Sequence, residues 1–86
     1  MPRISAFYGV VITMYFDEHA PPHFHARYAE FEAQIGIADG SILHGRLPRR
    51  VLGMVHEWAQ LHASELISNW ARARAGEALV TIEPLP

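Results

Sequence analysis

An alternation of apolar and polar residues between His23 and Ile37, interrupted only at Ala29-Glu30, constrains the fold of this chain more than any other feature. A period of two residues is typical of a β-strand with one buried face. If Ala29 and Glu30 form a two-residue hairpin loop, both halves of the pattern agree in one register. The apolar face then pairs Phe24 with Ile35, Ala26 with Ala33, and Tyr28 with Phe31. The polar face pairs His23 with Gly36, His25 with Gln34, and Arg27 with Glu32. Because a slip by one residue would mix the two faces, the sequence predicts this hairpin and this register.

Weaker signals predict one strand before the hairpin and one after it. The segment from Gly9 to Phe16 is rich in β-branched and aromatic residues, which favour strands. Asp39-Gly40 is a strong turn signal and leads into a short predicted strand from Ser41 to His44. The segment from Ala78 to Ile82 is a candidate for a final edge strand.

A helical region is predicted from Pro48 to Ala75. Pro48 suits the first helical position, and Gly76 is a typical C-terminal stop. Apolar residues recur between them at near-helical spacing, at Val51, Val55, Trp58, Leu66 and Trp70. An unbroken helix of this span would be about 42 Å long, whereas a domain of this size is only about 30 Å across. The sequence therefore predicts either a break between Leu61 and Glu65 or a homodimer packed through the two tryptophans.

Strands that are followed by helices, rather than alternating with them, predict an α+β fold. We expect an antiparallel meander of three to four strands, with a long or bent helical region packed on one face of the sheet. At 86 residues the chain suits a single domain, residues 1–86, with one hydrophobic core.

Composition excludes several functional classes. No cysteine is present, which rules out disulfides, thiolate nucleophiles and cysteine-bound zinc. The formal charge of −2 argues against broad electrostatic binding of nucleic acid, although it leaves room for a local basic site that binds RNA. The first residues lack the apolar stretch of a signal peptide, and the uncharged run 4–16 is too short for a membrane helix. We therefore expect a cytoplasmic protein with no membrane contact.

The densest chemistry in the chain is a group of histidines near the start of the predicted hairpin. His23 and His25 are two residues apart on a strand, so both imidazoles leave the same face. Two such nitrogens can hold zinc or another divalent metal when a third ligand folds back from the preceding loop. That ligand is His19, which gives a His19/His23/His25 cluster, or one of the neighbouring acids Asp17 and Glu18. The alternative is a solvated strand face that binds nothing.

The same face also fits a metal-free ribonuclease that needs no cofactor. His23 and His25 would act as general acid and base, and Arg27 would hold the phosphate. Against this, Arg27 lies opposite Glu32 in the predicted hairpin, which favours an ordinary cross-strand ion pair.

Three further arginines, Arg46, Arg49 and Arg50, cluster where the helical region is expected to begin. Cations oppose the helix dipole at that end, and a bound phosphate would turn the cost into a gain. Neutralisation by acidic side chains or by solvent is the simpler interpretation.

Several stretches of the chain form a recognisable set: Met1-Pro2-Arg3-Ile4-Ser5, Gly9-Val10-Val11-Ile12, Met14-Tyr15-Phe16, His19-Ala20-Pro21-Pro22-His23-Phe24-His25, Gly45-Arg46-Leu47-Pro48, and Glu57-Trp58-Ala59 to Asn69-Trp70. Together they resemble the family called domain of unknown function 4160, with Pro-Pro-His-Phe-His as the most specific stretch. The resemblance implies a small bacterial protein with no assigned activity or catalytic residues. Similar proteins are often encoded beside a member of domain of unknown function 2442, which implies a cognate protein partner and a toxin–antitoxin-like pair. The family usually has glycine where this chain has Ala29.

Three functional hypotheses follow. The first is a ribonuclease of a toxin–antitoxin-like pair, with His23 and His25 as its catalytic residues and arginines that hold phosphate. The second is a metal-binding protein that uses the His19/His23/His25 cluster. The third is a non-catalytic module whose sheet edge or tryptophan-bearing helix binds another chain.

Overall fold

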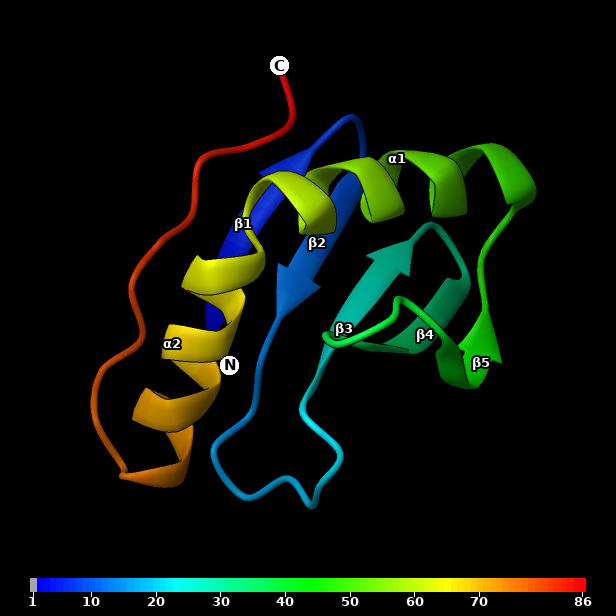
Figure 1. The fold of residues 1–86 in the computed structure, drawn as a ribbon. Coiled ribbons are helices and arrows are strands. Elements are labelled where there is room, and N and C mark those ends of the chain that lie inside the picture. The colour runs from blue at the N-terminus through cyan, green and yellow to red at the C-terminus, as the bar shows by residue number, and fades with distance from the viewer. Residues whose placement is uncertain (1) are drawn as a thin grey trace.

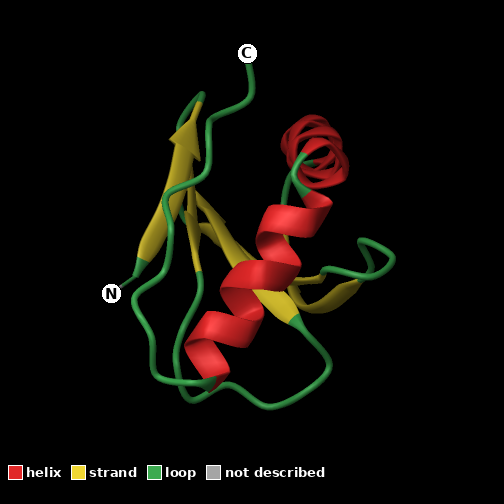
Figure 2. Ribbon diagram, turned by 60° about the vertical axis from the view of Figure 1, so that its left-hand side comes forward, coloured by secondary structure: helices red, strands yellow, loops and turns green. Residues whose placement is uncertain are grey.

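The computed structural model describes residues 2–86 and has an α+β fold, as expected. Five antiparallel strands form one sheet in the order β1-β2-β3-β4-β5, and two helices follow them along the chain (Figure 1). The strands are β1 (Arg3–Phe7), β2 (Val10–Thr13), β3 (His23–Tyr28), β4 (Phe31–Gly36) and β5 (Ile42–Arg46), and the helices are α1 (Arg49–Leu61) and α2 (Ala63–Arg74). Both helices lie on the same side of the sheet (Figure 2). On that side the Trp58 ring of α1 meets the Phe24 ring of β3 edge-on, with centroids 5.7 Å apart.

The strand count exceeds the expected three to four because the first strand was not predicted. The segment predicted as one strand, Gly9 to Phe16, contains only the four residues of β2, and β1 precedes it. The two strands are joined at Tyr8 and Gly9, whose φ angles of 49° and 84° give the tight turn that suits a two-residue hairpin. Tyrosine is an uncommon residue at positive φ, so the sequence carries only half of the usual turn signal here.

The predicted hairpin is confirmed in every pair. β3 and β4 run antiparallel with Phe24 opposite Ile35, Ala26 opposite Ala33 and Arg27 opposite Glu32, and with the remaining pairs in the same register. The loop residue Ala29 adopts a positive φ of 52°, a conformation that glycine reaches at lower cost.

β5 begins and ends slightly later than the predicted strand from Ser41 to His44, and it contains a bulge. The pairing with β4 shifts register next to Gln34, and Gly45 adopts a φ of 79°. A Cβ atom at Gly45 would lie 2.1 Å from the Glu32 carbonyl oxygen, so only glycine fits. In the preceding turn, the Ser41 amide donates a hydrogen bond to the Asp39 carboxylate (3.0 Å) and holds the pKa of that carboxyl below its usual value.

The helical region breaks at His62, as one of the two predicted alternatives requires. α1 ends at Leu61 and α2 begins at Ala63, so the described residues fit within 33 × 26 × 23 Å. α2 ends at Arg74, and the predicted stop signal Gly76 follows its C-cap with a φ of 73°, which allows the Glu77 amide to donate back to the Arg72 carbonyl oxygen at 2.8 Å.

The predicted final strand from Ala78 to Ile82 is wrong, although the segment does run along β1. The Ile82 amide donates one hydrogen bond to the Ile4 carbonyl oxygen (2.7 Å). The Asn69 side chain of α2 holds both the amide and the carbonyl of Val80, at 2.9 and 2.8 Å. Because a side-chain amide takes up the backbone groups of Val80, the segment covers the β1 edge without forming a regular strand.

Neither helix has the length and hydropathy that a bilayer-spanning segment needs, within residues 2–86.

Candidate functional site

The face of β3 that points away from Phe24 carries both imidazoles, as the alternation predicts, and both are buried rather than solvated. His23 and His25 are only 5% and 8% exposed. The ring of His23 lies against Trp70 of α2, with centroids 5.3 Å apart, and the ring of His25 meets Tyr15 edge-on, with centroids 4.6 Å apart. Aromatic packing from the helix and from the loop therefore fixes both rings.

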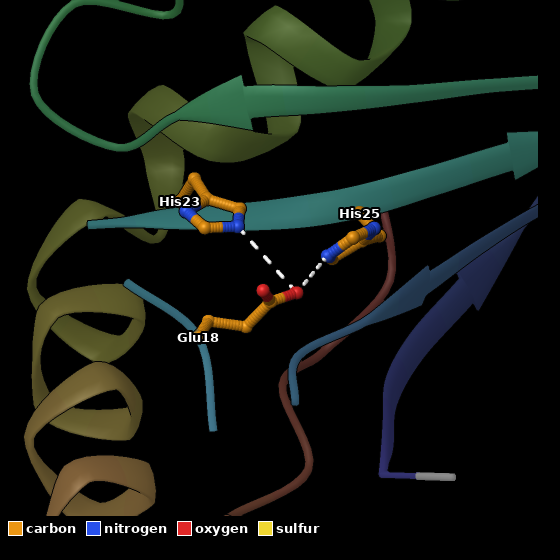
Figure 3. Close-up of side chains that lie close together, drawn as sticks. All are labelled: Glu18, His23 and His25. Carbon is orange, nitrogen blue, oxygen red and sulfur yellow. Dashed lines mark hydrogen bonds and ion pairs between the residues drawn. The ribbon is translucent and has the colours of Figure 1, made fainter. Parts of the chain in front are cut away.

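The loop between β2 and β3 brings a carboxylate to these rings. Glu18 Oε1 lies 2.5 Å from Nε2 of His25 and 3.6 Å from Nε2 of His23 (Figure 3). One atom from each of the three residues falls within 4.8 Å of the others. His19, named in the predicted metal cluster, is exposed and is not part of this group. The third member is instead Glu18, one of the two acids that the sequence offered as alternatives.

The protonation of His23 follows from its hydrogen bond to the backbone. Nδ1 lies 2.9 Å from the Pro21 carbonyl oxygen, which can only accept a hydrogen bond, so Nδ1 carries the proton. In the neutral ring, Nε2 is then left with a lone pair. That atom is buried and has no hydrogen-bond partner, and it is directed at the Glu18 carboxylate. In this neutral form, two electron-rich atoms face each other, one on a buried ring and one on a partly exposed carboxylate.

His25 lies between two carboxylates. Its Nε2 contacts Glu18, and its Nδ1 is 3.5 Å from Glu32 Oε2. Nδ1 is buried and makes no hydrogen bond. The sequence favoured an ion pair between Glu32 and Arg27, but no such pair forms within residues 2–86, and the Glu32 carboxylate approaches the His25 ring instead.

The two separations between Glu18 and the histidines are close to those of a metal centre. Nitrogen and oxygen ligands about 2.0–2.1 Å from a tetrahedral ion lie about 3.3 Å from one another. The Glu18–His23 separation of 3.6 Å fits this value, and the Glu18–His25 separation of 2.5 Å needs to widen by less than about 1 Å. The Glu18 side chain is 26% exposed and belongs to a loop, so it is the member that can move.

The predicted phosphate-binding arginines lie on the surface. Arg27 is exposed and lines a cavity of about 270 Å³ beside His25, together with Val11, Thr13, Tyr15 and Glu32. Arg46, Arg49 and Arg50 are exposed as well, and the Arg46 guanidinium lies 5.3 Å above the centre of the Phe31 ring. No hydrogen bond or ion pair of residues 2–86 joins these arginines to the two histidines.

Two parts of the site had weak signals in the sequence. The Pro21 carbonyl is a backbone atom, and no residue type announces its position. Glu32 shares the polar face of the hairpin with His25, two residues along from its partner Gln34, and diagonal neighbours on a sheet are within reach of long side chains. This diagonal relation is the sequence signal that could have predicted the contact between Glu32 and His25.

Comparison with known proteins identifies the family of this chain and assigns no activity to it. Neither the curated proteins nor the solved structures include one that matches this chain. A family model, Domain of unknown function (DUF4160), matches residues 9–71, which include both histidines, Glu18 and Glu32. The expected resemblance is therefore confirmed over most of the length, and the chain belongs to the DUF4160 family.

Proposed function

We propose that this protein binds one divalent transition-metal ion through the carboxylate of Glu18 and the Nε2 atoms of His23 and His25. The observation that carries the proposal is the buried Nε2 of His23, which lacks a hydrogen-bond partner and is directed at a carboxylate 3.6 Å away. A buried polar atom without a partner costs about 1–3 kcal/mol. A cation between the two atoms removes this cost and also offsets their mutual repulsion.

The ligand set favours one class of ion. Two imidazole nitrogens and one carboxylate oxygen suit zinc, iron(II) and neighbouring first-row metals. Calcium and magnesium favour all-oxygen sites, and the softest ions favour sulfur ligands, which the chain cannot supply from cysteine. Three protein ligands leave at least one coordination position for water or for another ligand.

The ribonuclease hypothesis uses the same imidazoles in a less favourable way. A general acid and base would have to flank a phosphate. Here the Glu18 carboxylate lies within reach of both Nε2 atoms and would repel a phosphate from the space between them. The ribonuclease, and the toxin–antitoxin pair in which it would act, stay predictions from the sequence, and the metal proposal does not depend on them.

Two neighbouring residues in the loop provide the test. Untagged protein, never exposed to a metal-affinity column, is stripped with a chelator and titrated with zinc against a chromophoric competitor. We expect wild-type protein to bind one equivalent, Glu18→Ala to bind at least about tenfold more weakly because it loses a ligand, and His19→Ala to match wild type. Failure of the wild type to bind would refute the proposal. Loss of binding in His19→Ala with retention in Glu18→Ala would move the site to the histidine cluster first predicted from the sequence.

A further inference from the structure

The two histidines differ in what their second ring nitrogen contacts. His23 Nδ1 donates to the main-chain carbonyl of Pro21. His25 Nδ1 is buried without a hydrogen-bond partner, and the charged group beside it is Glu32 Oε2 at 3.5 Å. A histidine that binds a metal through one nitrogen usually donates from the other to a carbonyl or a carboxylate. For His23, the Pro21 carbonyl already accepts such a hydrogen bond. For His25, the Glu32 carboxylate is in position to accept one.

The sheet fixes Glu32 in this position. Glu32 lies on β4, directly opposite Arg27 on β3 and Arg46 on β5. Directly opposite residues place their side chains on the same face, so the Glu32 carboxylate has an arginine on each of the two neighbouring strands. Within residues 2–86 it forms an ion pair with neither arginine, and it approaches His25 instead. The carboxylate is thus available to the imidazole.

Metal binding changes what Glu32 can do. The short contact between Glu18 and His25 needs a proton on Nε2 of the neutral ring, which leaves a lone pair on Nδ1 facing the Glu32 carboxylate. A metal on Nε2 takes the place of that proton, so the neutral ring carries its proton on Nδ1. This N–H is then directed at Glu32. The interaction of Glu32 with the neutral ring is unfavourable without the metal and favourable with it.

From this difference we infer that Glu32 is a positioning residue that raises the affinity of the site by accepting a hydrogen bond from His25 Nδ1. The inference rests on the proposed metal site and assigns to Glu32 a role that the ligands alone do not require. An acceptor in this position fixes the tautomer and the ring orientation and makes Nε2 a stronger ligand. A carboxylate does this more strongly than a neutral amide, because hydrogen bonds to ionised acceptors are stronger.

Glu32→Gln keeps the size of the side chain and removes its charge, and Glu30→Gln is the matched control because Glu30 is an exposed residue in the loop of the same hairpin. We expect zinc affinity to fall about 10–100-fold in Glu32→Gln and to be unchanged in Glu30→Gln. The thermal unfolding midpoint of metal-free Glu32→Gln should not fall below that of wild type. An affinity equal to that of wild type would overturn the inference while leaving the metal site intact. Absence of zinc binding in wild type would refute both.

A spectroscopic measurement separates positioning from a merely structural effect. Histidine ¹⁵N shifts of the zinc-loaded protein report which ring nitrogen is protonated. In wild type we expect His25 with Nε2 bound to metal and a slowly exchanging proton on Nδ1. In zinc-saturated Glu32→Gln this proton should exchange faster, while the His23 Nδ1 proton, held by Pro21, should not change. Zinc bound through Nδ1 of His25 would contradict the inference even if the affinity fell.

Discussion

His25 and Phe24 are adjacent in the sequence and have opposite roles in the structure. Both are almost completely buried, yet one contacts two carboxylates and the other packs against the Trp58 ring. The alternation of β3 separates them, so the site and the core share a strand without sharing a face. The precision of the site therefore depends on the packing behind it.

Phe24→Ala tests that packing. The side chain is completely buried, so its removal leaves a cavity in the core beneath α1. We expect the free energy of unfolding to fall by about 3–5 kcal/mol, as for other buried aromatic residues, measured by urea denaturation. Leu61→Ala, at a position 61% exposed, is the control and should change stability by about 0.5 kcal/mol or less. A loss in Phe24→Ala no larger than in this control would contradict the assigned core.

At the scale of the elements, β5 makes one very close backbone contact with β4. Gly45, which pairs with Ala33, lies against the backbone of Glu32, the residue that we assign to His25. A change in β5 therefore acts on the site through β4. A second glycine, Gly53 of α1, has no atom within 4 Å of an added Cβ and provides a contrast in the same chain.

The same substitution at the two glycines should have opposite effects. Gly45→Ala meets a carbonyl oxygen at 2.1 Å and a positive φ, so we expect it to destabilise the protein by more than about 2 kcal/mol. Gly53→Ala lies within a helix with open space around it and should stabilise by about 0.5–1 kcal/mol. Urea unfolding of both variants is the measurement. Equal effects would mean that β5 does not pack on β4 as described.

The elements also show why the sequence predicted some parts and not others. The hairpin could be predicted with its register because two strands carry the same periodic constraint. β1 could not, because Tyr8 is an unusual residue for the turn that ends it. The segment after α2 has the composition of a strand, but the Asn69 amide takes the place of a neighbouring strand. At the site, the alternation predicted that both histidines lie on the same face of β3. The position of Glu18 could not be predicted in this way, because Glu18 belongs to a loop with no repeating pattern.

For the whole molecule, the candidate metal joins segments that the sheet does not connect directly. Glu18 belongs to the long loop before β3, and both histidines belong to the sheet. A ligand that binds only the folded state stabilises it by mass action. The loop, the sheet and α2, which contacts His23 through Trp70, should therefore resist unfolding together when the metal is bound.

Thermal unfolding with zinc at one hundred times its dissociation constant tests this linkage. The expected gain is about 2.7 kcal/mol, which for a chain of this size corresponds to a rise in the midpoint on the order of 10 °C. Glu18→Ala at the same zinc concentration should show a much smaller rise, and addition of a chelator should reverse the effect in wild type. A midpoint that does not respond to zinc in wild type would contradict a site that forms only in the folded protein.

The two edges of the sheet differ in whether they are free to pair with a strand of another molecule. The segment near Ile82 occupies the β1 edge, whereas all five residues of β5 are exposed, with Ile42 and Leu43 about 40% accessible. A sheet with both edges free can add copies without limit, as fibrils do. Here only one edge is free within residues 2–86, so pairing of β5 with β5 of a second copy would leave two blocked outer edges. Growth by edge pairing would then end at a symmetric dimer, because the tail leaves no second edge open.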